Sequence, residues 1–90
     1  MKTLITPTAN TNGNTVNDMV NQVMDVVNKI QDTVGDMQKM DVYHGRNFQT
    51  VENAENVRNE AIDRLVERMN ALEKMKMDFF RLAMEIKQQE

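Results

Sequence analysis

Apolar side chains return every seven residues between positions 15 and 40. One row of this heptad holds Val16, Val23, Ile30 and Met37. A second row, three residues further along, holds Met19, Val26, Thr33 and Met40, and a flanking row holds Val20, Val27 and Val34. This repeat is typical of an amphipathic helix that packs against another helix. It predicts a helix over residues 15–40 with Thr15 as its N-cap and with a kink or an early end at Gly35.

A longer heptad pattern follows in the second half of the chain. Its core positions, interrupted by Lys76, are Ile62, Leu65, Met69, Leu72, Phe79, Ala83 and Ile86. No glycine or proline occurs after Gly45, and good helix formers dominate, so a helix is expected over residues 51–88 with Thr50 as its N-cap. Because the intervening segment 41–50 is short and contains a turn glycine, the two helices are expected to lie antiparallel.

The first residues of the chain have a different character. Residues 1–14 are rich in threonine and asparagine and carry a single charge, at Lys2. Such a segment has little apolar surface to offset the entropy of ordering it, which predicts a disordered arm. No apolar core of about 7–15 residues follows Lys2, which argues against a cleaved Sec signal. A charge-poor arm of this kind also suits an uncleaved export signal.

The two expected helices differ in length. At 1.5 Å per residue they measure about 37 Å and about 57 Å. Pairing Met40 with Val51 would place Val16 opposite Met75 and leave the end of the second helix uncovered. An exposed apolar cluster there predicts an interface with a second copy or a partner helix. The expected interface residues are Met75, Phe79, Phe80, Leu82, Ala83 and Ile86. In the alternative, Leu4 and Ile5 fold back over this cluster.

The expected contact line between the two helices, here called the seam, uses the first row of each heptad pattern. Its residues are Val16, Val23, Ile30, Met37, Ile62, Leu65, Met69 and Leu72. A hairpin with one apolar stripe on each helix encloses little core. The pattern therefore favours an oligomer or a complex with another helical protein.

The amino-acid composition excludes several common kinds of catalytic site. The chain has no Cys, no Ser and a single His, which excludes thiolate sites, Ser–His–Asp catalysis and His-rich metal sites. No phosphate-binding glycine loop, zinc-protease motif or calcium loop occurs, so neither a cofactor nor a metal is expected. Asp32, Asp36 and Asp41 are interpreted as solvated side chains rather than as a catalytic pair. His44 either forms part of a polar turn or contacts a phosphate.

Charge and methionine content bear on the partner. Eleven basic and fourteen acidic residues give a net charge of −3, which argues against nucleic acid and anionic membranes as partners. Arg58, Arg64 and Arg68 could form a basic strip, but acidic residues alternate with them. Nine methionines either form an adaptable binding surface or fill gaps in a helical core.

Two short strings resemble helical axial proteins of flagellar and type III secretion machines. Arg46-Asn47-Phe48-Gln49-Thr50 is similar to an R-N-x-Q-S string of needle subunits. Val57-Arg58-Asn59, followed by Glu67 and Met69, is similar to the closing helix of a flagellar rod adaptor. In those families the strings lie near the C-terminus, whereas here most of the second expected helix follows. The resemblance implies a polymerising subunit and assigns no functional residue.

The expected fold is all-α: an antiparallel helical hairpin with coiled-coil-like packing over residues 15–90 and a disordered arm over residues 1–14. The expected function is that of a non-enzymatic assembly, adaptor or chaperone-like protein. The alternatives are a secreted or virion subunit that polymerises through the hairpin and a small nucleic-acid-associated regulator. The expected location is the cytoplasm, or outside the cell after export without a cleaved Sec signal.

Overall fold

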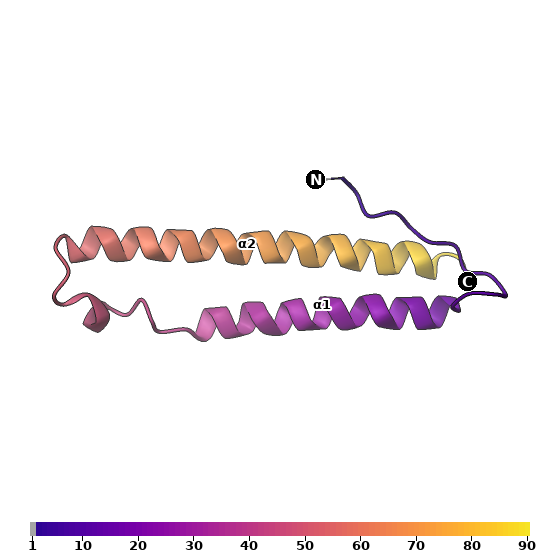
Figure 1. The fold of residues 1–90 in the computed structure, drawn as a ribbon, viewed down its shortest axis with the longest axis horizontal. Helices are drawn as coiled ribbons and strands as arrows, with labels where there is room; N and C mark the ends of the chain where they lie inside the picture. Colours follow the sequence, from indigo (N-terminus) through magenta and orange to yellow (C-terminus); the bar gives the residue numbers. More distant parts are fainter. Residues whose placement is uncertain (1) are drawn as a thin grey trace.

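A computed structural model describes residues 2–90 and contains two long helices. Helix α1 spans Val16–Lys39 and helix α2 spans Ala54–Lys87, with the short 3-10 helix η1, Gly45–Phe48, between them. The two long helices lie side by side and antiparallel (Figure 1). The molecule is elongated, with extents of 63 × 23 × 16 Å. The expected all-α class, with two helices packed together and no strand in the described part, is confirmed.

The start of α1 follows from its capping residue. The Thr15 hydroxyl accepts a hydrogen bond from the Asp18 backbone N–H at 3.1 Å, which satisfies one of the free donors of the first turn. Of the two alternatives expected at Gly35, the early end is wrong, because α1 continues through this residue to Lys39. Packing of the neighbouring apolar residues against α2 therefore outweighs the low helix propensity of glycine.

Helix α2 begins three residues later than expected. Its N-cap is Asn53, which has left-handed backbone angles of φ 55° and ψ 40° and makes no side-chain cap bond. Thr50 lies instead in the turn that follows η1, where the Val51 N–H donates to the Phe48 carbonyl at 3.1 Å. Asparagine tolerates the left-handed region better than most residues, which suits Asn53 to the turn into α2.

One hydrogen bond shows how the helices are aligned. Lys76 Nζ of α2 donates to Gln31 Oε1 of α1 at 2.6 Å, so these residues lie opposite each other. The expected alignment of Val16 with Met75 is therefore wrong. Residues 40–53 do not form a tight turn but run beside the start of α2, and they displace α1 toward the other end (Figure 1). The part of α2 that extends beyond α1 is its N-terminal part.

Burial identifies the rows that face each other. The described residues that are buried are Val27 at 7% exposure, Val34 at 2%, Ala83 at 0% and Ile86 at 1%. On α1 the second seam row is therefore Val20, Val27 and Val34, and the expected row of Met19, Val26, Thr33 and Met40 is more exposed. Both pairs of rows alternate steps of three and four residues, so the spacing alone does not choose between them, and the burial of Val27 and Val34 against α2 does.

The N-terminal arm is not disordered as expected but lies against the last turns of α2. The Thr6 hydroxyl donates to the Glu85 carboxylate. The Gln89 side chain accepts from the Ala9 N–H at 2.9 Å and donates to the Pro7 carbonyl at 2.7 Å. A glutamine amide both donates and accepts hydrogen bonds. It therefore bonds to backbone groups of the extended arm that have no neighbouring strand and would otherwise bond to water.

Candidate interaction surfaces

The acidic side chains and the histidine of residues 2–90 are not gathered into a metal-binding cluster. No group of three or more His, Asp or Glu side chains is placed to hold a metal ion within residues 2–90. Asp32, Asp36 and Asp41 are all exposed. Every buried side-chain polar atom in this part of the chain has a hydrogen-bond partner.

The loop around His44 is held together by local bonds. His44 Nδ1 accepts from the Arg46 N–H at 3.1 Å and so caps η1. Arg46 pairs with Asp41 at 2.5 Å, and the rings of Tyr43 and Phe48 lie 6.5 Å apart. Of the two interpretations of His44, these contacts support a residue of a polar turn.

Lys76 occupies a core position of the α2 heptad. Its side chain is only 18% exposed and lies between Gln31 of α1 at 2.6 Å and Glu73 at 2.8 Å. A lysine in an otherwise apolar seam is costly unless it is paired. Because Glu73 lies on the same helix as Lys76, only the bond to Gln31 depends on the alignment of the helices, and this bond favours the observed alignment.

A cavity of about 420 Å³ opens where α1 ends and α2 continues. Its apolar lining comes from the last turn of α1, the connecting segment and α2, and consists of Met37, Met40, Tyr43, Ile62, Leu65 and Met69. The expected seam residues Ile62 and Leu65 therefore lie next to this cavity. We call this region the open end of the hairpin.

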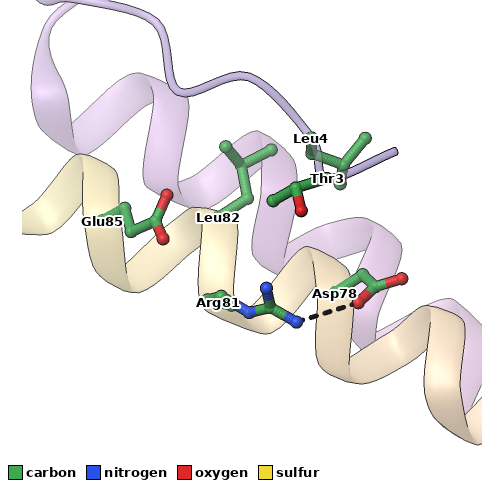
Figure 2. Close-up of a pocket in the computed structure, with 6 residues that line it drawn as sticks. All are labelled: Thr3, Leu4, Asp78, Arg81, Leu82 and Glu85. Carbon is green, nitrogen blue, oxygen red and sulfur yellow. Dashed lines mark hydrogen bonds and ion pairs between the residues drawn. The ribbon is translucent and has the colours of Figure 1, made fainter. Parts of the chain in front are cut away.

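The arm covers a different side of α2. Figure 2 shows Thr3 and Leu4 beside Leu82, close to the Asp78–Arg81 ion pair, whose atoms are 3.1 Å apart. The space between them is only about 10 Å³, which leaves room for about one water molecule. Leu4 lines this small cavity, whereas Ile5 is 91% exposed. The fold-back alternative is therefore correct for Leu4 and wrong for Ile5.

The six expected interface residues do not share one surface. Ala83 and Ile86 are buried in the hairpin and Phe79 is half-buried at the next core position of the same heptad, so the idea that they project beyond α1 is wrong. Leu82 lies under the arm, and Met75 lines a neighbouring cavity of about 340 Å³ with Lys2 and Thr3. Phe80 lies on a face of α2 that is apart from both the seam and the arm.

Phe80 belongs to a stripe that alternates steps of four and three residues along α2, a spacing that places side chains on one helix face. The stripe consists of Glu73, Met77, Phe80, Met84 and Lys87, and we call it the Phe80 face. Met77 is 56% exposed and Phe80 is 38% exposed. This spacing is visible in the sequence, but the expected alignment of the helices assigned Phe80 to one large cluster with Phe79, Ala83 and Ile86 and so hid the separate stripe.

Two further expected seam residues, Met37 and Met69, also line the open end. All eight expected seam positions are half-buried, four on each helix.

Neither long helix has an apolar stretch of the length and hydropathy that a membrane span requires, within residues 2–90. Comparison of the chain with protein-family models, with curated proteins and with solved structures found no match.

Proposed function

We propose that this protein is a non-enzymatic assembly protein that acts by binding other helices, its own or those of a partner. One observation carries the proposal. Among residues 2–90, four hydrophobic residues are buried, whereas eleven large hydrophobic residues are exposed. A soluble hairpin with so small a core gains stability when another helix covers the exposed residues.

The open end favours an adaptor role toward a partner helix. Ile62, Leu65 and Met69 continue the apolar row of α2 past the point where α1 stops, and the cavity beside them measures about 420 Å³. An amphipathic helix binds such a groove through apolar residues spaced three and four apart. Flexible methionines such as Met37 and Met40 adapt to the shape of an entering side chain.

A polymerising subunit is the second candidate. The open end and the Phe80 face lie at different places along a molecule 63 Å long. If one of these surfaces bound the other on the next copy, the contact would repeat without closing and would generate a filament. Concentration-dependent growth without a limiting mass distinguishes this candidate from a closed assembly.

The ion pairs of the surface weigh against a nucleic-acid partner. Four basic side chains, those of Arg46, Arg64, Lys76 and Arg81, are paired with a carboxylate within 3.1 Å. Paired side chains contribute little to the positive field that phosphate binding requires. The same argument disfavours an anionic membrane surface.

The test is the mass of the purified chain in sedimentation experiments over a wide concentration range, repeated at about 0.5 M salt. We expect a mass above that of the monomer that increases with concentration and survives the added salt, because apolar packing is insensitive to screening. A chain that stays monomeric at every concentration, and that binds a nucleic-acid probe only at low salt, would overturn the proposal.

A further inference from the structure

We infer that a second copy of this chain docks on the Phe80 face, across a two-fold axis that passes beside Phe80. The two α2 helices would then run antiparallel, each laying Met77, Phe80 and Met84 against the same residues of the other copy. This inference rests on the proposed function and names one partner for it.

The apolar part of the face is uncovered in the hairpin. Met77 and Phe80 are 56% and 38% exposed, and Met84 is half-buried beside them. The arm does not shield these residues, because its contacts go to Asp78, Arg81, Leu82, Glu85 and Gln89. An aromatic ring with flanking methionines is typical of the centre of a protein interface.

The charges at the two ends of the face select the orientation. Glu73 and Lys87 lie seven residues before and after Phe80, each about 10.5 Å away along the helix axis. A two-fold axis at Phe80 therefore brings Glu73 of each copy next to Lys87 of the other. A parallel, in-register arrangement would instead pair Glu73 with Glu73 and Lys87 with Lys87, which is unfavourable.

The residues of helix α1 next to the Phe80 face are uncharged and so do not repel a second copy. Lys76 Nζ lies near both Gln31 and Glu73, so the row of α1 that contains Gln31 borders the Phe80 face. This row carries no charge and consists of Asn17, Met24, Gln31 and Gln38. The exposed acidic residues Asp18, Asp25 and Asp32 lie about 100° further around α1, so a dimer would not bury them.

The size of the face predicts a dimer of modest affinity. From Glu73 to Lys87 the stripe is about 21 Å long, which is short compared with interfaces that bury about 800 Å² on each partner. We therefore expect a reversible dimer that dissociates on dilution, with a dissociation constant of roughly micromolar order.

Charge reversal tests the pairing directly. Glu73→Lys gives a chain with two positive ends on the Phe80 face, and Lys87→Glu gives a chain with two negative ends. We expect each variant alone to dimerise at least about tenfold more weakly than the native chain. An equimolar mixture should form a mixed dimer as readily as the native chain, because opposite charges then meet at both ends.

The matched control reverses an ion pair away from this face. Glu60→Lys combined with Arg64→Glu exchanges two exposed residues that are paired with each other in the native chain. This double variant should dimerise like the native chain. Since Glu73 also pairs with Lys76, the helical signal and the melting temperature of Glu73→Lys are recorded at a concentration where the native chain is monomeric.

A crosslinking experiment keeps the test decisive if Glu73→Lys fails to fold. The native chain has no cysteine, so one introduced thiol is unique. Phe80→Cys should link to its own copy through a short bis-maleimide reagent. Val66→Cys, at an exposed position of the same helix, should not, because the two-fold axis would separate the two thiols by about 42 Å.

The outcomes separate this inference from the proposed function. Selective linkage at position 80 together with rescue in the mixture supports the dimer. If the native chain self-associates but Val66→Cys links as well as Phe80→Cys, or the mixture of folded variants shows no rescue, the dimer is wrong and the proposed function stands. A native chain that stays monomeric, together with a Phe80→Cys variant that does not link, overturns the dimer, and the sedimentation test with the nucleic-acid probe then decides the proposed function.

Discussion

Helix α2 passes through two different environments. Its C-terminal part lies against α1 on one side and the arm on another, and it contains both fully buried positions of α2, Ala83 and Ile86. Its N-terminal part faces residues 40–53, and there the equivalent heptad residues Ile62 and Leu65 are only half-buried beside a cavity. The same spacing of apolar residues therefore produces a core only where a regular helix lies opposite. A heptad defines the face of a helix, whereas the partner decides how deeply that face is buried.

The largest effect that distinguishes the two parts should come from a buried charge. Val34→Asp places a carboxylate without a partner at a position that is 2% exposed, and we expect it to lower the free energy of unfolding by about 4 kcal/mol or more. Val57→Asp, at a 40% exposed position in the first turn of α2, should change it by less than about 0.5 kcal/mol. Chemical denaturation of both variants checks this. Equal losses would mean that Val34 is no better packed against α2 than Val57 is against the connecting segment.

A second variant tests what aligns the two parts. Lys76→Met replaces a mostly buried, paired lysine by an apolar residue of similar length, and we expect it to raise the free energy of unfolding by about 1 kcal/mol. The same change should loosen the alignment of α1 on α2, which would appear as broadened amide signals along α1. Lys74→Met, at an exposed position two residues away, should leave these signals sharp. Sharp signals in both variants would show that apolar packing alone aligns the helices.

A third variant concerns the contribution of the arm to the C-terminal part. Leu4→Ala removes the side chain that lies beside Leu82, and since Leu4 is 38% exposed we expect a loss of about 1 kcal/mol (Figure 2). Faster amide exchange in the last turns of α2 should accompany it. Ile5→Ala, at the adjacent position with 91% exposure, is the matched control and should have no measurable effect. Equal behaviour of the two variants would mean that the arm does not stabilise α2.

The smallest expected effect is a gain in stability. Gly35 lies inside α1, and a methyl group added there would meet no atom within 4 Å. Gly35→Ala should therefore raise the free energy of unfolding by about 0.5–1 kcal/mol, because alanine loses less backbone freedom on folding. Thermal melting measures the change. A decrease would indicate that α1 needs to bend at this position.

The helices themselves were predictable because their signals are local. Heptad spacing and a Thr15 cap suffice to place α1 to within a residue at each end. The choice between the rows of Val27 and of Val26 was not predictable in the same way, because both are apolar and only contact with α2 separates them. The alignment of the helices depends on the path of residues 40–53 and on the Lys76–Gln31 bond, neither of which follows from periodicity.

The same limit applies to the candidate surfaces. The sequence indicated one apolar cluster near the end of α2, and the fold divides it among the seam, the arm and the Phe80 face. The arm was missed because its order depends on Gln89 and Thr6, which are distant from each other in sequence and resemble ordinary surface residues. Side-chain bonds of this kind leave no periodic signal along the chain.

The position of Tyr43 allows the open end to be followed by tyrosine fluorescence. The chain has no tryptophan and a single tyrosine, which lines the cavity with Met40 and Ile62 and lies near the ring of Phe48. All tyrosine emission of the native protein therefore originates at this one place. A helix that entered the open end would displace water from the phenol, so a spectroscopist could follow occupancy of the cavity without attaching a dye.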